Sequence, residues 1–451
     1  MSDLLSLLSL GSAGIAAQNA GVAVASNNVA NVNTAGYSRQ RVDLQALSLL
    51  PGGVRSGATQ RLADDLLADR VRVAGGSLAM SRATASALGD LETRLARTGP
   101  TVDEQVANLF ASFGALSAAP GDTGRRSDVL AAAGALADGI RRRAADVASA
   151  QQDSDLRIRD GAKQVTSLAK QLAAANQAVG RSGDPAMRDR RDQLAAQLSE
   201  LVGGRARIGA DGQMRFVLDD GAVLVDGDRA AQLAVSPGPG GLAKLEVVDG
   251  ASRRDVTATL GGGSVGAQLR VRDVTLARTA AQLDQLAFDV ATQVNAVHTA
   301  NAGLDGVAGR PMFTPPAQLA GAAAALAIDP ALAADPKLLA AAAAGAPSGD
   351  NRGALALFEL GSRPVAAGGT SLGDAALAII GDLARSGAEA KAAAARDELV
   401  AAHLGDLRDS LSGVDMQEEL ANLARFEHAS QAMTKVVAVV DSLLGSLIDR
   451  L

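Results

Sequence analysis

Apolar residues recur at intervals of three, four and seven positions near both ends of this chain, as they do along the contact face of a coiled coil. The N-terminal stripe consists of Leu8, Ile15, Val22 and Val29. The C-terminal stripe consists of Phe426, Met433, Val436, Val440, Leu443 and Leu447. These patterns predict two long terminal helices that pack on each other and bury both stripes.

The two terminal helices differ in their predicted stability. The N-terminal stripe is interrupted by Gly11, Gly14 and Gly21. Because a glycine inside a helix costs about 1 kcal/mol relative to alanine, we expect this helix to need a partner before it becomes ordered. At the other end, Asp415 and Glu418 have the spacing of a capping box. The C-terminal helix is therefore predicted to start near Met416.

Between the ends, the pattern predicts further helices and one block of strands. A seven-residue repeat from Ile158 to Val179 predicts a rod-like helix, and another helix is expected from about Val265 to Ala300. Capping signals at Thr101 and Asp184 predict two more helix starts. From Arg205 to Leu260 the pattern changes to six short strand-like runs separated by glycine turns: RARI, MRFVL, AVLV, AQLAV, KLEVV and VTATL.

These elements predict a mainly α fold, with long coiled-coil-like helices from both chain ends forming an elongated body and one small inserted β domain. The expected units are a terminal coiled-coil domain (1–36 with 412–451), a helical body (37–204 with 264–411) and the β insert (205–263). Residues 327–354 are rich in alanine, proline and glycine, which predicts short turns and loops on the body surface.

Composition narrows the possible partners. Aromatic residues make up only 2% of the chain, and small aliphatic residues favour close helix packing. The formal charge is −6, and no basic block alternates with aromatics, which argues against nucleic acid. Cysteine is absent, so disulfides and thiolate metal sites are excluded. Asp3 stands where a secretory signal would carry basic residues, and the longest apolar tract, Leu319–Ile328, is too short to cross a bilayer.

Candidate catalytic motifs are weak. The three histidines, His298, His403 and His428, lack metal-ligand spacing, so we expect no metal and no cofactor. GGGSVG (261–266) matches a dinucleotide motif but lacks a βαβ context. GTSLG (369–373) matches a hydrolase elbow, with Ser371 as nucleophile and His403 as base, but no buried strand precedes it. Ser371 or Asp374 is expected to cap a helix, and a hydrolase using Ser371 is kept as an alternative.

The stretch SNNVANVNTAGYSRQRVDL, from Ser26 to Leu44, contains the only tyrosine of the chain. Asparagines disfavour helix interiors and a glycine reversal follows them, so the N-terminal helix is predicted to end between Val29 and Asn33. Tyr37 is predicted to be an anchor where helix changes to extended chain, with a hydroxyl that stays hydrated or finds a partner. The other interpretation, which residue type alone favours, is that Tyr37 plugs the end of the local core.

This stretch resembles the N-terminal signature of the flagellar axial proteins of bacteria. The motif residues are Asn27, Asn28, Asn31, Asn33, Thr34, Gly36, Tyr37, Ser38, Arg39 and Gln40. YSRQRVDL, together with residues 188–204, 221–235 and 265–306, resembles the hook-associated branch of the family, with rod or hook proteins as the alternative. The sequence departs from the family at Ser430 and near Ala375, where an aromatic is usual.

The resemblance implies a structural subunit, not an enzyme, of the junction ring between hook and filament, needed for filament assembly and motility. The terminal helices would form an inner layer and the β insert would face outward. Implied partners are other copies in a ring, hook protein on one side, the second junction protein (hook-associated protein 3) on the other, and a cytoplasmic chaperone at the C-terminal helix. The implied location is extracellular, on the flagellum, after type III export without a cleaved signal peptide and without membrane insertion.

Overall fold

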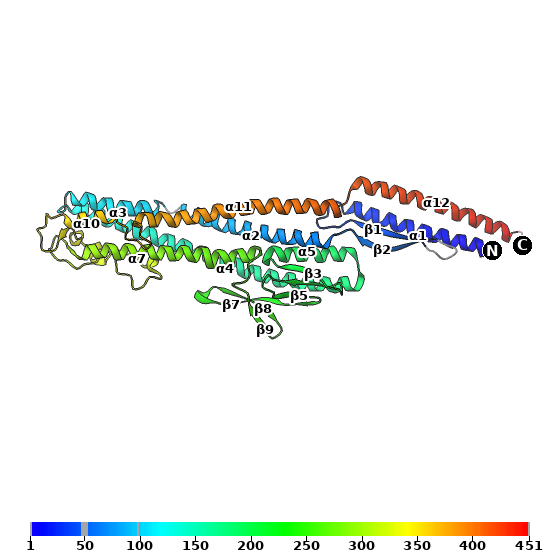
Figure 1. Ribbon diagram of the computed structural model, residues 1–451, viewed down its shortest axis with the longest axis horizontal. Coiled ribbons are helices and arrows are strands. Elements are labelled where there is room, and N and C mark those ends of the chain that lie inside the picture. The colour runs from blue at the N-terminus through cyan, green and yellow to red at the C-terminus, as the bar shows by residue number, and fades with distance from the viewer. Residues whose placement is uncertain (1, 47–52, 97–98, 450–451) are drawn as a thin grey trace.

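The protein is a long, mainly helical rod in the computed structural model, which describes residues 2–46, 53–96 and 99–449 (Figure 1). Both termini lie at one end of the rod, where α1 (Ser2–Ala30) runs beside α12 (Met416–Ile448). This arrangement confirms the predicted mainly α fold and the predicted pairing of the terminal helices.

A β-hairpin and a two-helix segment connect the terminal pair to the rest of the rod. Strands β1 (Gln40–Ala46) and β2 (Val54–Arg61) pair antiparallel beside α1. Helix α2 (Asp65–Ala96) then packs against the long α11 (Leu372–Ser412), which leads back to α12. The chain therefore leaves the terminal pair and returns to it on neighbouring helices.

The body is built from long helices around one elongated core. Its elements are α3 (Val102–Ser117), α4 (Thr123–Ser182), α5 (Pro185–Val202), α6 (Gly263–Arg270), a π-helical turn (Val271–Leu276) and α7 (Ala277–Thr299). Helix α4 alone has 60 residues, which is about 90 Å of helix. Fully buried side chains from α2, α3, α4 and α7, such as Leu91, Phe113, Ile140 and Val294, hold these helices together.

Short elements close the far end of the body. Residues 327–354 form short turns and helices as predicted, but they are not confined to the surface, because Leu332, Leu339 and Ala341 are buried in the core. The short elements include α8 (Ala322–Ala325), α9 (Pro330–Ala334), a 3-10 turn (Pro336–Leu338), α10 (Arg352–Leu360) and the paired strands β10 (Asn301–Ala302) and β11 (Ala342–Ala343). Aspartates cap two of these turns, because Asp329 accepts from the Ala331 amide and Asp335 from the Lys337 amide.

The inserted β domain lies against α4 as two small antiparallel sheets (Figure 1). One sheet contains β3 (Arg205–Ile208), β4 (Met214–Val217), β5 (Val223–Asp226) and β6 (Arg229–Ala230). The other contains β7 (Gln232–Pro237), β8 (Ala243–Asp249) and β9 (Ser252–Asp255). The predicted strand VTATL is wrong: residues 256–260 form a turn in which Val256 and Leu260 are buried, because they plug the end of the second sheet.

Buried polar side chains attach the insert to α4. Asn176 donates to the carbonyls of Met214 at 2.8 Å and Gly227 at 2.7 Å, and it accepts from the Met214 amide at 3.0 Å. The two ends of the insert meet where the backbones of Gly203 and Gly262 cross so closely that a Cβ on either would lie 2.8 Å from the other. The glycines of GGGSVG therefore serve a close backbone crossing and the start of α6.

Most predicted helix ends are confirmed. Helix α1 ends at Ala30, α5 begins after its cap Asp184, and α12 begins at Met416. Helix α3 begins after Thr101, whose amide donates to Glu104 at 2.9 Å. The helix expected from Val265 to Ala300 is interrupted by the π-helical turn before α7.

Two helical stretches, Leu4–Ala30 and Leu372–Ile448, are long and apolar enough to cross a membrane by length and composition. Core helices of other proteins pass the same test, so this is weak evidence of insertion. Here α1 packs along α12 instead.

His298 on α7 is fully buried and holds the short elements at the far end. Its Nδ1 lies 2.8 Å from the Arg310 carbonyl, and its Nε2 accepts the Ala340 amide at 2.9 Å. Burial lowers the pKa of His298 from 6.5 to about 4, so the imidazole is neutral at pH 7 and can accept that bond.

We expect His298 to make the protein acid-sensitive. The unfolded chain binds the proton near pH 6.5 and the folded chain only near pH 4, so stability falls as pH drops between these values. The loss approaches about 3 kcal/mol. Urea unfolding from pH 7.5 to 4 measures it. In His298→Gln this part of the pH dependence should disappear, and equal slopes in both proteins would contradict the assignment.

Candidate functional site: the joint between the terminal helices and the body

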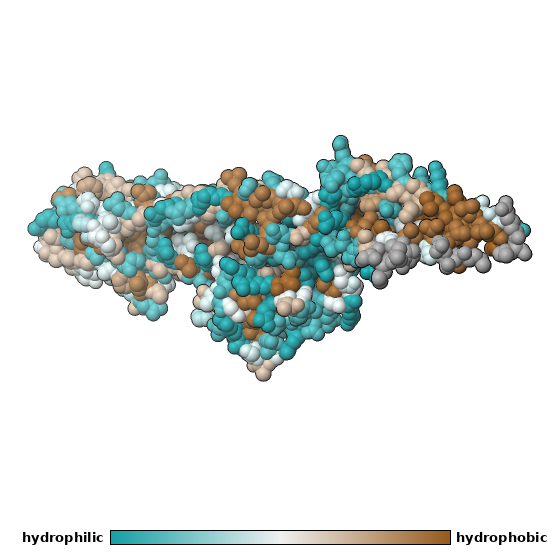
Figure 2. Space-filling view, turned by 45° about the vertical axis from the view of Figure 1, so that its right-hand side comes forward, coloured by the Kyte–Doolittle hydropathy of each residue, from teal (hydrophilic) through white to brown (hydrophobic). Residues whose placement is uncertain are grey.

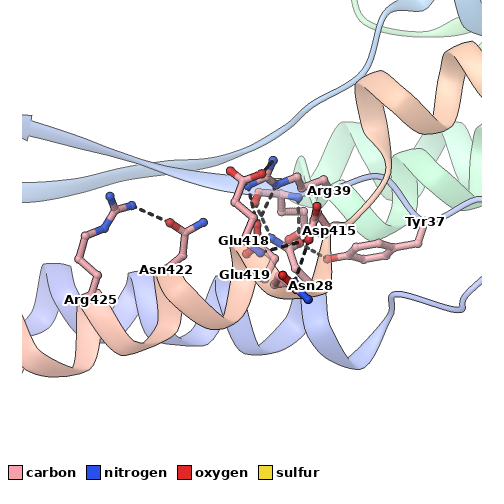
Figure 3. Close-up of polar contacts among 10 residues, drawn as sticks. Asn28, Tyr37, Arg39, Asp415, Glu418, Glu419, Asn422 and Arg425 are labelled. Atoms are coloured by element: carbon pink, nitrogen blue, oxygen red, sulfur yellow. Dashed lines mark hydrogen bonds and ion pairs between the residues drawn. The ribbon is translucent and has the colours of Figure 1, made fainter.

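Asn28, in the last turn of α1, is the buried centre of the joint (Figure 3). Its Nδ2 donates to the Gln40 carbonyl at 2.8 Å and to Glu419 Oε2 at 3.0 Å. Its Oδ1 accepts from the Gln40 amide at 2.9 Å and from the Tyr37 hydroxyl at 2.8 Å. All four hydrogen-bonding positions of the amide are used, so one side chain connects α1, the turn, β1 and α12.

Tyr37 contacts its own chain at this joint. Its hydroxyl donates to Asn28, and its backbone amide donates to the Thr34 carbonyl at 3.1 Å. Burial, with smaller contributions from the negative charges of Asp189 and Glu419, raises the pKa of Tyr37 to about 12. The phenol therefore stays protonated and remains a hydrogen-bond donor, which agrees with the predicted anchor at the end of the helix.

The remaining motif residues shape the reversal between α1 and β1. Asn31 donates to the Asn27 carbonyl at 2.9 Å and accepts from Thr34 Oγ1 at 3.2 Å, which closes the last helical turn. Gly36 has φ +75°, a left-handed conformation that favours glycine, and a Cβ there would lie 2.6 Å from the side-chain Nε2 of Gln193. Asn33 is exposed on the outside of the turn.

Arg39 joins β1 to the first turn of α12. Its guanidinium donates to Glu419 Oε1 at 2.8 Å and to Glu418 Oε1 at 2.6 Å, and its backbone amide donates to the Ser412 carbonyl at 2.8 Å. The hydrogen bond to Glu418 is the main cause of a raised Arg39 pKa. Asp415 caps α12 as predicted, by accepting from the Gln417 amide at 2.8 Å. The predicted capping partner Glu418 instead pairs with Arg39.

A second set of contacts fixes the joint to α5. The Ser38 amide donates to Asp189 at 3.1 Å, and Arg61 donates to Asp189 at 3.0 Å and to Asp192 at 2.6 Å. Burial raises the pKa of Asp189 although these groups favour its charged form. Gln193 also donates to the Ala35 carbonyl at 2.8 Å. The joint therefore holds the direction of the terminal pair relative to the body.

Small residues form the seam between α1 and α12. The buried positions of α1 are Gly11, Gly14, Ala17, Gly21, Ala25 and Asn28. A Cβ at Gly21 would lie 2.7 Å from the Phe426 ring, and one at Gly14 would overlap Met433. The glycines therefore accept side chains of α12 and allow the two helices to approach closely. Their role in pairing was not evident from the sequence, which showed them only as interruptions.

The prediction that pairing buries both apolar stripes is wrong for half of the C-terminal stripe. Phe426, Met433 and Val440 face α1, with Val440 buried. Val436, Leu443 and Leu447 point elsewhere and are 44 to 50% exposed. On α1, the predicted residues Leu8, Ile15, Val22 and Val29 are only partly buried. Because small residues occupy the seam, the larger aliphatic side chains are turned outward, and Figure 2 shows hydrophobic surface along this end of the rod.

The structure gives no support to the hydrolase alternative. Ser371 caps α11 by accepting the Asp374 amide at 3.1 Å, as predicted. His403 is exposed on the same helix, 32 residues further, which is about 48 Å along the axis. His428 is exposed on α12. Within residues 2–46, 53–96 and 99–449, no cluster of ligating side chains could hold a metal ion.

Sequence reasoning missed several partners of the motif. Glu419, Asp189 and Arg61 lie far from it in sequence, and nothing in their local pattern indicates the contact. The only available signal was Arg39 itself, because a cation beside a buried turn needs an acid partner.

An elongated helical rod with a polar joint and an exposed apolar face on its terminal pair is typical of a structural protein. Comparison with known proteins agrees. The model of the flagellar hook-associated protein FlgK helical domain matches residues 88–313. This match covers half of the chain, and the protein belongs to the FlgK family of flagellar hook-associated proteins.

Individual relatives extend the similarity over nearly the whole chain. Flagellar hook-associated protein 1 of Escherichia coli K12 is 25% identical, covering 98% of this chain and 99% of that protein. The Bacillus subtilis 168 protein of the same name is 26% identical, covering 96% of each chain. The structure of the hook junction protein FlgK from Burkholderia pseudomallei matches 76% of this chain and 100% of its own, with TM-score 0.69 and 15% identity, and shows the shared fold.

Family membership confirms the function that the motif implied. The protein is a structural component of the bacterial flagellum at the hook–filament junction, and it is not an enzyme. The rod-protein, hook-protein and hydrolase alternatives are set aside.

We expect Asn28→Ala to loosen the joint locally. The substitution leaves the Gln40 amide and carbonyl buried without partners, at a cost of about 3 kcal/mol. Amide exchange of Gln40 should accelerate about a hundredfold. Asn33→Ala, at an exposed position of the same turn, is the matched control and should leave exchange unchanged. Equal exchange in both variants would contradict the central role of Asn28.

Replacing Gly14 by leucine is expected to separate the terminal helices, because the new side chain would occupy the space of Met433. Protection from amide exchange should fall in both α1 and α12. Ala16→Leu adds the same side chain at an exposed position two residues away and should preserve protection. If Gly14→Leu retains full protection, the tight seam is refuted.

Proposed function

We propose that copies of this protein associate through their terminal helices into a ring at the junction of hook and filament. The observation that carries the proposal is the outward apolar face of α12. Val436, Leu443 and Leu447 are joined there by the exposed residue Val439. A contiguous exposed apolar face is typical of an interaction surface, and here it extends along a helix whose seam with its own partner is already filled.

The two halves of the C-terminal stripe have separate roles in this proposal. Phe426, Met433 and Val440 pair α12 with α1 inside one copy, whereas Val436, Leu443 and Leu447 contact a neighbouring copy. The axial motif holds this pair at a set direction, because Asn28, Tyr37 and Arg39 tie it to β1 and, through Ser38, to α5. Every copy then presents its apolar face at the same angle, as closed symmetry requires.

The division of the chain into units and the positions of its neighbours follow from the same placement of the terminal helices. The units are the terminal pair (1–36 with 412–451), the helical body (37–204 with 264–411) and the β insert (205–263). The terminal pair forms the inner layer of the ring, and the insert faces outward. Hook protein lies on one side and hook-associated protein 3 on the other.

Export to the flagellum uses the type III route. A cytoplasmic chaperone holds the C-terminal helix before export. The exposed aliphatic side chains of α12 support this step, because a helix that is apolar on two faces is prone to aggregation until it is covered. A ring of such subunits is needed for filament assembly and motility.

We expect the double substitution Val436→Glu with Leu443→Glu to abolish filament attachment and swimming. Two carboxylates would have to be buried in an apolar contact between copies, which is strongly unfavourable. Motility in soft agar and electron microscopy of the hooks measure the effect in cells whose only copy is the variant. Hooks without filaments are expected.

The matched control is Gln431→Glu with Thr434→Glu, which adds the same charge at exposed polar positions of α12. This variant should swim. Both purified proteins should retain the helical content and the melting temperature of the parent, because all four positions are exposed. Normal swimming by the Val436/Leu443 variant would overturn the proposed assembly surface.

A further inference from the structure

The exposed face of the first sheet of the β insert carries a row of charged side chains. The insert projects from one side of the rod (Figure 1). One face of the four-stranded sheet is buried towards α4, where Met214, Phe216 and Leu224 are fully covered. On the opposite, exposed face the strand register places one residue from each strand side by side: Arg207, Arg215, Asp226 and Arg229.

This row holds more positive charge than its own chain neutralises. Arg207 lies directly opposite Arg215, and like charges in that position destabilise a sheet. Arg215 donates to Asp226 at 2.8 and 2.7 Å, which occupies the one carboxylate of the row. Arg207, and Arg205 two residues before it on the same face, make no ion pair and no side-chain hydrogen bond within the described residues. Two guanidinium groups are therefore free to bind an anion from outside the chain.

The second sheet of the insert differs in this respect. Lys244 pairs with Asp255 at 3.2 Å, Arg253 with Glu246 at 3.2 Å, and Arg254 with Asp220 at 3.3 Å. Every basic residue of that sheet has a carboxylate partner. The formal charge of the whole chain is −6, so acidic side chains are not scarce. The uncompensated arginines are therefore a feature of the first sheet and not of the insert as a whole.

The spacing of the row indicates what kind of anion it suits. Residues opposite each other on neighbouring strands lie about 5 Å apart, and alternate residues of one strand lie about 7 Å apart. A guanidinium group binds a carboxylate or a similar oxyanion through two parallel hydrogen bonds. A ligand that contacts several of these arginines therefore carries anionic groups repeated along its length, as a charged polymer does.

Two classes of charged polymer fit this face poorly. Single-stranded nucleic acid binds by stacking its bases on aromatic side chains, and no exposed side chain in residues 205–230 is aromatic. An acidic peptide in extended form needs a free strand edge for its backbone. Here β3 lies beside α2, and β6 at the other edge has only two residues. A sulfated or carboxylated polysaccharide needs neither feature.

We propose that the exposed face of the first sheet binds an anionic polysaccharide through Arg205, Arg207, Arg215 and Arg229. The four arginines provide charge complementarity, and Asp226 holds Arg215 in place within the row. The insert lies apart from α12 (Figure 1), so this binding is separate from the contacts of the proposed ring and does not depend on them.

Binding of the full-length protein to immobilised polysaccharides tests the proposal. The probes are heparin, which is sulfated, and polygalacturonate, which is carboxylated, with neutral dextran and poly-L-glutamate for comparison. Binding to at least one anionic polysaccharide is expected, and it should weaken at least tenfold from about 50 to about 300 mM NaCl, because counterions are released on binding. Binding to dextran, tighter binding to poly-L-glutamate, or binding to neither anionic polysaccharide would overturn the proposal.

Substitution locates the binding on this face. Arg205→Gln with Arg207→Gln should weaken binding about tenfold, because two free guanidinium groups are lost. Arg253→Gln with Arg254→Gln is the matched control, since it removes the same charge from exposed positions of the same insert, and it should change affinity by less than about twofold. An unchanged melting temperature checks that each variant keeps its fold. Equal losses of affinity in the two variants would show that net charge and not this face is recognised, and would refute the site.

Discussion

The structure depends on one buried amide. Asn28 uses all four of its hydrogen-bonding positions, on Gln40, Tyr37 and Glu419, at the point where α1, β1 and α12 meet. No apolar residue could replace it without leaving the Gln40 amide and carbonyl buried and unpaired. Glu419 is in turn buried against Arg39, so the ion pair and the amide are one network. This network fixes the direction of the terminal pair of helices relative to the body.

In the terminal pair, small residues lie inside the contact between the two helices and large aliphatic residues lie outside it, which is the reverse of the usual arrangement. Glycine and alanine fill the contact within the chain, where a Cβ at Gly11, Gly14 or Gly21 would collide with α12. Close approach gains dispersion contacts along the backbone but buries little of each large aliphatic side chain. Val436, Leu443 and Leu447 then remain exposed. The helix pair therefore leaves an apolar face exposed, which fits the proposed contact between copies in the ring.

Polar contacts hold the β insert on helix α4. Asp155 on the 60-residue α4 receives Arg272 at 2.5 Å and the Ala243 amide at 2.6 Å, so one carboxylate connects the π-helical turn and the β insert to the same helix. Asn176 repeats this connection further along α4. These polar ties are specific in direction, unlike apolar burial, and they fix the insert on one side of the body.

The sequence by itself determined several helix caps and the place where α1 ends at the joint. Asp184, Ser371 and Asp415 cap helices as their local pattern indicates, because capping involves residues only two or three positions apart. The motif around Tyr37 likewise indicated the end of α1 and the family. Prediction failed at VTATL, where strand-forming residues plug a core instead of extending a sheet, since burial overrides local propensity.

Only the tertiary structure decided which faces pair. A seven-residue repeat places Val436, Met433 and Val440 close together on one side of a helix, but the angle of contact depends on the partner helix. Met433 and Phe426 pack against the glycines of α1, whereas Val436 lies outside the contact. The shape of the α1 surface therefore decides which side chains of α12 are covered, and their hydrophobicity does not. Contacts such as Arg39 with Glu419 join residues 380 positions apart, and no local pattern carries information over that distance.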